Sequence, residues 1–423
     1  MTATDEHARL SGGVMTQRMA QFIDANPELE TPFLVIDLDV VADRYRSLTA
    51  ALPTTDVFYA VKANPAHEIV ELLVQMGAFF DVASPGEVDL CLGLGADPAR
   101  LSYGNTVKKD RDIAYAASRG IRIFTVDCQE ELTKVISHAQ GGSVFVRLAT
   151  DGADADWPLS RKFGCTVNEA WPLMLQAAES GYAVGISFHV GSQQRNPMAW
   201  DTPIAEAATL LNQLREAGYA TAGVNLGGGL PSTYTDPTPE VTAYGEAITA
   251  LLHKHLSEFG CRTIIEPGRY LVGDSGVLRS EVVLVADRET DPGRRWVYLD
   301  IGMFNGLTEA LGEAIRYQIT HEPSEVALGP VVLAGPSCDS ADVLYETYEY
   351  QLPMDLSAGS RLSFLATGAY TSSYSSVWFN GFEPLRSYFL PVTSESVQSN
   401  SLTSVAASDG VRAPGVESDE SGE

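Results

Sequence analysis

The sequence lacks long hydrophobic runs and closely spaced cysteine pairs. No stretch approaches the roughly 20 apolar residues of a membrane-spanning helix, and the N-terminus shows no basic region followed by a hydrophobic segment. We therefore expect a soluble, cytoplasmic protein that does not bind a membrane. The five cysteines, none of them in a CxxC spacing, predict neither a disulfide framework nor a metal site.

Basic residues are also few. In 423 residues, 55 acidic side chains outnumber 28 basic ones, and the formal net charge is -27. A surface of this sign repels phosphate backbones, so nucleic acid is not an expected partner. The charge is compatible with high solubility or with a cationic ligand.

The two ends of the chain differ from its middle. Residues 1–30 are polar and weakly patterned, and we interpret them as an N-terminal extension. Residues 392–423 are rich in serine and acids and lack aromatic side chains, which predicts a disordered acidic tail.

Short apolar runs alternate with helical patterns between residues 37 and 276. Eight runs have the length and composition of buried strands: 57–61, 79–83, 101–104, 123–126, 144–148, 185–190, 223–226 and 263–265. Segments with apolar residues at helical spacing lie between many of these runs, at 66–76, 85–94, 110–119, 129–138 and 205–217. The alternation predicts an α/β fold with a parallel sheet, and eight strands favour a (β/α)8 TIM barrel. A doubly wound open sheet would show the same alternation.

Strands without long intervening helices follow residue 276. The runs are 279–286, 295–300, 331–334, 361–364 and 386–390. They predict a C-terminal antiparallel β domain over residues 277–391, which the early run at 31–36 would join.

Lys62 is the best candidate nucleophile in the chain. It ends an apolar strand pattern and is followed by an Asn-Pro pair that begins a helix. Partial desolvation at such a position lowers the pKa of a lysine and favours the neutral amine that imine chemistry needs. A lysine that merely extends to solvent from a strand end fits the local pattern equally well.

Other reactive side chains also follow predicted strands. In a TIM barrel the catalytic groups gather at the carboxyl ends of the strands. The residues at or just past these ends are Lys62, Ser84, Asn105, Asp127, Arg147, His189, Gly227 and Glu266. Polar residues also follow strands by default, because strands end where polarity returns.

The second half of the predicted barrel contains a two-part anion site. Gly227, Gly228 and Gly229 follow a strand and free backbone amides to approach a phosphate. After the next strand, Glu266 and Arg269 lie three residues apart, and they suit a protonated ring nitrogen and a phosphate, respectively. Taken alone, the glycines fit a flexible turn and the charged pair an ordinary salt bridge.

His189 ends a further strand and is followed by small residues. A lone histidine there is more often structural, but its ring is suited to stacking on a flat cofactor. A lysine for an imine, a phosphate cradle, a carboxylate for a ring nitrogen and a stacking imidazole together match the requirements of pyridoxal 5'-phosphate (PLP).

Several longer segments carry a family resemblance that covers residues 31–391. They are YAVKAN at 59–64, FDVASPGE at 80–87, HVGS at 189–192, GGG at 227–229 and EPGR at 266–269. With them the chain resembles the fold-type III, or alanine-racemase-like, PLP-dependent decarboxylases, which act on ornithine, lysine, arginine or diaminopimelate. The resemblance implies a PLP-binding TIM barrel, a C-terminal β domain and a homodimer with two shared active sites.

The resemblance also implies roles for individual residues. The catalytic set is Lys62, His189, Glu266 and Cys338, the cysteine reaching across the dimer interface to protonate the decarboxylated carbon. The implied cofactor-binding set is Lys62, Asp81, Arg147, His189, Ser192, Gly227, Gly228, Gly229, Glu266, Gly268, Arg269 and Tyr370. Asp81 and Glu87 are interpreted as partners that orient Lys62.

Substrate recognition is predicted at four positions. The resemblance places Asp339 at the amino end of the substrate and Phe382 in an aromatic wall from the partner subunit. Glu309 and Glu313 lie at the i, i+4 spacing of a helix, so both could face the pocket. They fit a solvated helix face as well.

The implied activity is decarboxylation of a basic L-amino acid, ornithine or lysine, to putrescine or cadaverine in polyamine biosynthesis. The segment around Glu309 is similar to the bacterial lysine/ornithine type. Arginine, carboxynorspermidine-like substrates and diaminopimelate are alternatives, although the CDSAD sequence at 338–342 differs from the CESGD of diaminopimelate enzymes. An inactive regulatory homologue is a further alternative, which the presence of Lys62, Glu266, Arg269 and Cys338 disfavours. A racemase is another, but it would need a tyrosine base where this chain has Cys338.

Overall fold

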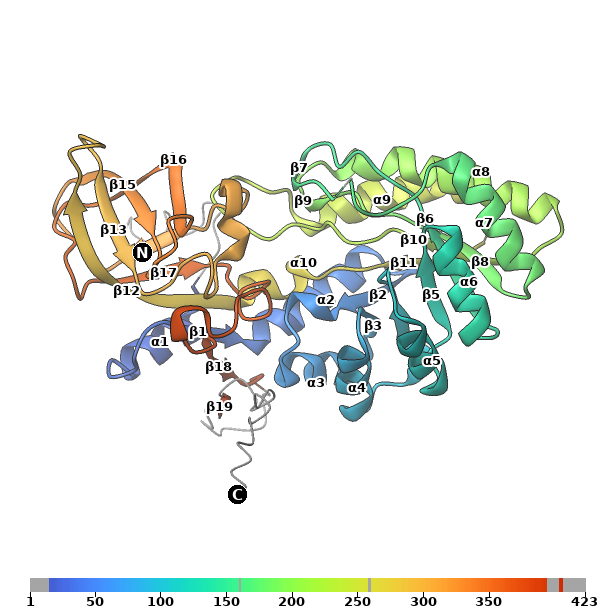
Figure 1. The fold of residues 1–423 in the computed structure, drawn as a ribbon, viewed down its shortest axis with the longest axis horizontal. Helices are drawn as coiled ribbons and strands as arrows, with labels where there is room; N and C mark the ends of the chain where they lie inside the picture. The colour runs from blue at the N-terminus through green and yellow to red at the C-terminus, as the bar shows by residue number, and fades with distance from the viewer. Residues whose placement is uncertain (1–14, 160, 258–259, 394–402, 406–423) are drawn as a thin grey trace, which may run out of the picture.

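The chain forms a parallel barrel joined to a separate sheet. The computed structural model describes residues 15–159, 161–257, 260–393 and 403–405. Figure 1 shows the barrel, blue to green, beside the orange strands of the sheet. None of the helices in these ranges is long and apolar enough to cross a membrane.

All eight barrel strands are parallel, and the sheet closes in the order β10-β11-β2-β3-β4-β5-β6-β8. Their bounds are β2 Thr55–Ala60, β3 Phe79–Val82, β4 Leu101–Tyr103, β5 Ile123–Val126, β6 Ser143–Arg147, β8 Ala183–Ser187, β10 Thr221–Asn225 and β11 Thr263–Ile265. Each of the eight predicted runs contains one of these strands or overlaps it. The closed order confirms the predicted barrel and excludes the open doubly wound sheet.

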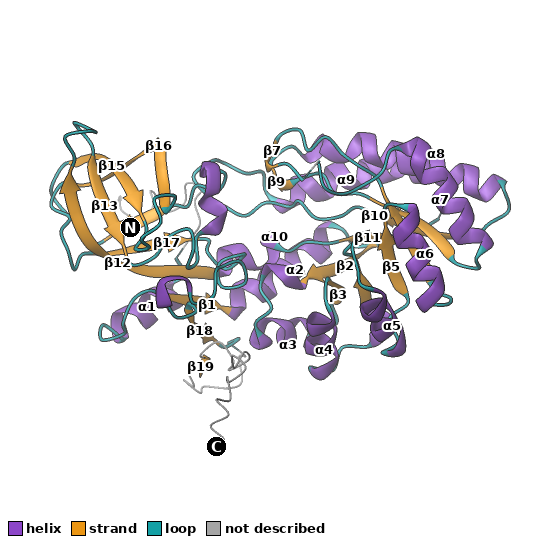
Figure 2. Cartoon of the chain, viewed as in Figure 1, coloured by secondary structure: helices purple, strands orange, loops and turns teal. Residues whose placement is uncertain are grey.

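Helices cover the outside of the barrel, as the purple ribbons in Figure 2 show. They are α2 Leu38–Ala51, α3 His67–Gln75, α4 Pro85–Gly93, α5 Asp110–Ser118, α6 Gln129–His138, α7 Val167–Glu179, α8 Asp201–Glu216 and α9 Val241–Leu256. The short, buried α10 Arg269–Val272 follows β11. Local capping sets several starts. Ser84 accepts a hydrogen bond from the Glu87 amide at α4, and Thr166 forms a capping box with Glu169 at α7.

Short 3-10 turns and a small ribbon complete the barrel half. The turns are η2 Val61–Ala63, η3 Pro98–Arg100, η4 Pro197–Trp200 and η5 Gly273–Ser275. Strands β7 Ala155–Trp157 and β9 Ser192–Gln194 pair as a two-stranded sheet.

Large side chains from four barrel strands form a separate buried cluster: Phe58, Ile123, Phe145 and Ile264. Gly185 provides the space for one of them, because a Cβ there would lie 2.4 Å from the Phe145 ring. A packed interior of this kind is typical of TIM barrels, and it leaves the strand ends and their loops to form sites.

The second sheet contains strands from both ends of the described chain. Its members are β1 Phe33–Asp37, β12 Gly276–Asp287, β13 Arg295–Leu299, β14 Ile319–His321, β15 Leu328–Ala334, β16 Val343–Pro353, β17 Arg361–Leu365, β18 Arg386–Leu390 and β19 Thr403–Val405. Strand β1 lies between β12 and β18, so the early run joins this sheet. Two 3-10 turns, η6 Thr308–Glu313 and η7 Phe379–Gly381, lie in its loops.

The sheet is mixed, whereas an antiparallel one was predicted. Strand β1 pairs with β18 in parallel, and β13 pairs with β15 in parallel. The long connections between these partners permit parallel pairing, which short hairpins would not. Strands β14 and β16 were not predicted, although β16 alternates between buried and exposed residues over part of its length.

The two terminal segments carry more structure than was predicted. Helix α1 Gln17–Ala25 is capped by Thr16, and Arg18 pairs with Asp37 and Asp39 at the start of α2. Most of the predicted acidic tail lies outside the described residues. The three residues of β19 within it pair with β18.

Candidate active site

A cavity lies at the carboxyl ends of the barrel strands and unites most of the predicted cofactor residues. Its lining consists of Ala60, Lys62, His189, Ser192, Gly228, Gly229, Leu230, Glu266, Gly268, Arg269 and Tyr370. The side chains come from the ends of β2, β8, β10 and β11, and Tyr370 comes from the loop after β17.

Lys62 lies in η2, directly after β2, and its Nζ is 2.9 Å from Asp81 Oδ2. The lysine side chain is half exposed in the cavity, and that of Asp81 is 5% exposed. Burial favours the neutral amine, but the charge of Asp81, with Tyr370 and Glu266, outweighs it and raises the pKa of Lys62. The prediction of a lowered pKa was therefore wrong, because it considered the desolvation of Lys62 and left out the negative charge of Asp81. The interpretation of Asp81 as a partner of Lys62 agrees with the 2.9 Å contact.

Glu266 follows β11 and contacts the end of β10. Asn225 Nδ2 donates a hydrogen bond of 2.6 Å to Glu266 Oε1. Burial and then the nearby Asp81 raise the pKa of Glu266 to about 7, against the opposing effects of Lys62, Asn225 and Arg147. A carboxyl group with this pKa is suited to exchanging a proton with a ring nitrogen near neutral pH.

His189 follows β8 as a neutral ring. The Gly191 amide donates a 3.1 Å hydrogen bond to His189 Nδ1, so this nitrogen is the acceptor and Nε2 carries the proton. Burial, together with the cationic Arg147 and Lys62, holds the pKa of His189 well below its ordinary value. The cavity therefore presents an uncharged imidazole, as stacking against a flat cofactor requires.

The glycine loop after β10 leaves no room for side chains. Gly227 has φ +66, and a Cβ there would lie 2.0 Å from the Phe188 carbonyl oxygen. A Cβ on Gly228 would meet the Glu266 carbonyl oxygen at 2.8 Å and His189 Nε2 at 3.0 Å. The loop thus packs its backbone against both groups, as a close approach to a phosphate demands.

Arg269 begins α10 and is almost fully buried. It forms two 2.6 Å hydrogen bonds with the two carboxylate oxygens of Glu309, and it also donates to the Tyr234 hydroxyl at 2.8 Å. Arg269 Nη2 donates to Ser192 Oγ at 3.1 Å, and the guanidinium carbon lies 5.0 Å from the ring centre of Tyr370. Glu309, Tyr234 and Ser192 thus fix the orientation of the predicted phosphate-binding cation.

The remaining predicted cofactor residues surround this cavity. Gly268 lies close to Tyr370, since a Cβ on it would be 3.2 Å from the tyrosine hydroxyl. Tyr370 adopts φ 54, and its amide donates to the Ala63 carbonyl at 2.8 Å. The guanidinium carbon of Arg147 lies 5.1 Å from the Phe163 ring centre, and burial lowers the pKa of this arginine.

Glu309 and Glu313 do not share a helical face. Both lie in η6, but Leu311 and Gly312 have non-helical backbone angles that separate them. Glu309 is buried against Arg269, whereas the Glu313 carboxylate accepts hydrogen bonds from the amides of residues 346–348. The predicted i, i+4 arrangement was therefore wrong, because Gly312 takes a left-handed conformation at φ 63.

Three other predicted residues of the β domain, Cys338, Asp339 and Phe382, lie apart from this cavity within one chain. Cys338 is exposed in the loop after β15, where Asn380 Nδ2 is 3.2 Å from its sulfur. Asp339 is exposed and accepts a hydrogen bond from the Ala341 amide at 2.9 Å. Phe382 is half-buried at the end of η7, and none of the three lines the Lys62 cavity.

Sequence reasoning missed two residues of the site. Asn225 ends β10 and Tyr234 lies in the following loop, and both bond to predicted residues. The signal for Asn225 was its place at a strand end, two residues before Gly227. Tyr234 had no comparable signal, because its contact with Arg269 arises only when the loop folds back.

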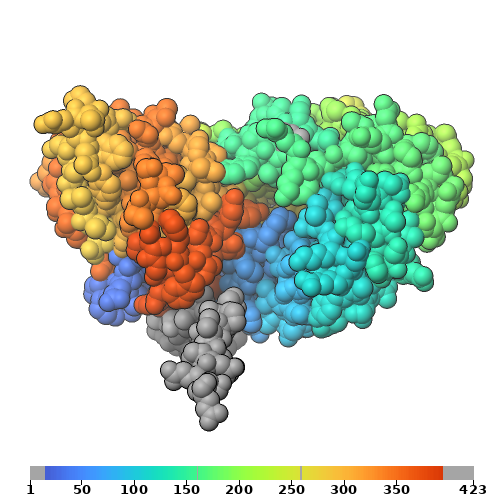
Figure 3. All heavy atoms as spheres, in the orientation of Figure 1, coloured from blue at the N-terminus to red at the C-terminus, as the bar shows by residue number. Residues whose placement is uncertain are grey.

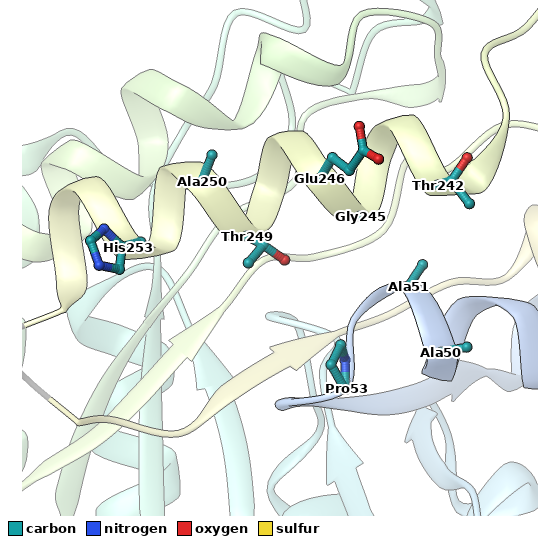
Figure 4. Close-up of a pocket in the computed structure, with 9 residues that line it drawn as sticks. All are labelled: Ala50, Ala51, Pro53, Thr242, Gly245, Glu246, Thr249, Ala250 and His253. Atoms are coloured by element: carbon teal, nitrogen blue, oxygen red, sulfur yellow. The ribbon is translucent and has the colours of Figure 1, made fainter.

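A larger surface hollow lies elsewhere, between the end of α2 and α9. Figure 4 shows its lining residues, Ala50, Ala51, Pro53, Thr242, Gly245, Glu246, Thr249, Ala250 and His253. Only Glu246 and His253 among them are ionisable, and they lie on different turns of α9. The hollow therefore offers no arrangement comparable to the Lys62 cavity.

The cavity residues fit PLP. Lys62 provides an amine, Glu266 a carboxyl group for the ring nitrogen, and His189 an imidazole for the ring face. The glycine loop, which leaves no space for a Cβ, and the adjacent Arg269 suit the phosphate.

Comparison with known proteins identifies the class. The family described as "Pyridoxal-dependent decarboxylase, pyridoxal binding domain" matches residues 38–273, which is more than half of the chain. The protein belongs to this family of PLP-dependent decarboxylases, and this confirms the predicted cofactor and the resemblance.

The relatives include decarboxylases and a protein named as an inhibitor. The chain is 35% identical to the lysine/ornithine decarboxylase of Selenomonas ruminantium over 84% of its own length and 88% of the relative. It is similar to the structure of the Vibrio vulnificus lysine/ornithine decarboxylase complexed with cadaverine, with a TM-score of 0.80 and 31% identity over 89% of this chain and 100% of the other. It is also 33% identical to antizyme inhibitor 2 of Xenopus laevis, over 83% and 79% of the two chains.

Proposed function

We propose that the protein decarboxylates L-ornithine, L-lysine or both, and releases putrescine or cadaverine. The observation that carries this proposal is the single cavity in which Lys62, His189, Glu266 and Arg269 face one another. The similarity to lysine/ornithine decarboxylases over most of the chain supports the substrate class.

The chain's own residues then act as follows. When bound, PLP would supply an electron sink for the loss of the carboxylate as carbon dioxide. Glu266 would hold a proton for the ring nitrogen, and His189 would present its neutral imidazole to the ring. Arg269 and the glycine amides would hold the phosphate and so position the cofactor for Lys62.

Proton delivery calls for a second subunit in this proposal. Cys338 and Asp339 are exposed on a loop that does not line the Lys62 cavity of their own chain. Nearby, Val377 and Trp378 are 63% and 57% exposed, although they are large and apolar. Val377 and Trp378 belong to the segment between β17 and β18. The red part of Figure 3, which includes this segment, lies on the visible face between the orange sheet and the blue barrel residues. We propose a homodimer in which these loops reach the partner's cavity, where Cys338 donates the proton.

Release of carbon dioxide, with identification of the amine product, tests the activity. Purified protein with PLP is offered ornithine, lysine, arginine and diaminopimelate separately, beside a Lys62→Ala variant. We expect ornithine or lysine to be the best substrate, with a loss of at least roughly a thousandfold in the variant. Arginine or diaminopimelate as the preferred substrate would correct the proposal.

A regulatory role is the second candidate, because antizyme inhibitor 2 is a relative. The presence of Lys62, Glu266, Arg269 and Cys338 favours the enzyme. Silence on all four amino acids, in a protein that binds PLP, would favour the regulatory role or an untested substrate.

Subunit mixing tests the shared site. Lys62→Ala and Cys338→Ala chains are each expected to be inactive alone. Random pairing of the two gives half heterodimers, each with one intact site, so activity should recover to roughly a quarter of the wild-type level. No recovery on mixing, with dimers shown by sedimentation, would place Cys338 outside the partner's site.

A further inference from the structure

Asn225 connects the two halves of the cofactor site through one buried side chain. It ends β10 and is 2% exposed. Its Oδ1 accepts a 2.9 Å hydrogen bond from the Gly227 amide, and its Nδ2 donates the 2.6 Å bond to Glu266 Oε1. The Glu266 amide in turn donates to the Gly227 carbonyl at 2.8 Å. The three residues therefore form a closed ring of hydrogen bonds.

The orientation of the Asn225 amide is fixed by its partners. The Gly227 N–H is a donor, so it requires the oxygen of the side-chain amide. The NH2 group must then point toward Glu266, and it can only donate. Glu266 Oε1 is consequently the acceptor of this bond. This favours a carboxyl proton on Oε2, because a carbonyl oxygen accepts a hydrogen bond better than a hydroxyl oxygen does.

We propose that Asn225 is a positioning residue that confines the exchangeable proton of Glu266 to Oε2 and sets the orientation of this carboxyl group toward the cofactor ring nitrogen. The inference deepens the proposed function and rests on it, because Glu266 acts there on bound PLP. A carboxyl group without this donor could rotate and place its proton on either oxygen.

The surroundings of Glu266 make this donor important. The ionisable groups that affect it are Asp81 from β3, Lys62 from η2 and Arg147 from β6. Asp81 opposes ionisation of Glu266, whereas Lys62 and Arg147 favour it. The Asn225 amide is a neutral hydrogen-bond donor, and it also favours the ionised carboxylate. Replacing that donor with a second carboxylate reverses its effect.

Two variants separate the positioning role from a structural one. Asn225→Asp keeps an acceptor for the Gly227 amide but places an oxygen where the donor was. Asn225→Leu removes both bonds. Thr263→Val is the matched control, because it removes buried hydrogen bonds to Thr55 and Thr54 at the other end of the same barrel strand as Glu266.

The readouts are the affinity of the PLP-free protein for PLP, the pH dependence of the bound cofactor's visible absorbance, and thermal unfolding. We expect Asn225→Asp to weaken PLP binding by about 10- to 100-fold, because a hydrogen bond to a charged group is replaced by a like charge. The pH midpoint of the absorbance should rise by about one unit, since two close carboxylates share a proton. Thr263→Val should lower thermal stability without changing affinity or midpoint.

The inference would be overturned if Asn225→Asp bound PLP with wild-type affinity and its absorbance had an unchanged pH midpoint. A loss seen only in Asn225→Leu would assign Asn225 to the glycine loop alone, which also overturns it. These measurements need PLP binding but no turnover. A wild-type protein that binds PLP and releases no diamine would thus count against the proposed function and still leave this test valid.

Discussion

Arg269 and Glu309 form a two-point ion pair inside the protein, with both N–O distances at 2.6 Å. Their side chains are only 3% and 8% exposed. The carboxylate compensates the arginine's charge and, with Tyr234 and Ser192, fixes the guanidinium plane. This gives Glu309 a function in the site other than the predicted contact with substrate.

Removing Glu309 should destabilise the fold. Glu309→Ala leaves Arg269 as an uncompensated buried charge, so we expect the free energy of unfolding to fall by about 3–5 kcal/mol. Asp43→Ala is the control, because its partner Arg46 is exposed and such pairs contribute about 1 kcal/mol or less. Denaturant titration of the PLP-free proteins measures both. If Glu309 instead binds the substrate, the variant will keep its stability and its KM for ornithine and lysine will be higher than that of the wild type.

The sequence predicted the barrel and most of the cavity because both follow from local patterns. A buried strand is recognisable from its apolar run, and Lys62, His189 and Glu266 each stand where such a run ends. In a closed parallel barrel the strand ends share one rim, so residues distant in sequence converge without any further information.

Other features of the site and of the second sheet depend on contacts that local sequence patterns do not encode. The pKa of Lys62 is set by its distance from Asp81, and Glu309 turns away from Glu313 because Gly312 breaks the helix. Parallel pairing of β1 with β18 joins residues about 350 positions apart in the chain, which strand patterns alone cannot anticipate.

The Asp81 contact predicts a shift in the reactivity of Lys62. In Asp81→Asn the carboxylate that contributes most to the raised lysine pKa is gone and burial remains, so the pKa of Lys62 should fall. Covalent capture of PLP by the amine, trapped with borohydride, should then begin at lower pH than in the wild type. An unchanged pH profile of capture would show that Asp81 does not control this amine.

Glu266 should make the PLP-free protein more stable in mild acid. Its pKa in the folded chain is about 7, above the ordinary value of 4.5, so the folded state holds a proton that the unfolded state has lost between these values. This contribution is fully present below pH 4.5 and is lost as pH rises through 7, and it amounts to roughly 3 kcal/mol. The measurement is the free energy of unfolding at pH 5 and pH 8 in wild type and Glu266→Gln. From pH 5 to pH 8 the free energy of unfolding should decrease less in the glutamine variant than in the wild type. Equal decreases in the two proteins would contradict the raised pKa of Glu266.

Gly228→Ala should impair PLP binding more than it impairs folding. The added Cβ would lie 2.8 Å from the Glu266 carbonyl oxygen and 3.0 Å from His189 Nε2, so the loop, the imidazole or both must shift. A shift of this kind displaces the phosphate cradle relative to Glu266, and we expect PLP affinity to fall about tenfold or more. Gly93→Ala is the control, because nothing lies within 4 Å of its added Cβ at the end of α4. Fluorescence titration with PLP and thermal unfolding of the PLP-free proteins separate the two effects. Unchanged PLP affinity in Gly228→Ala would mean that the loop can move away without cost to the cofactor, and the glycine would then not be required for phosphate binding.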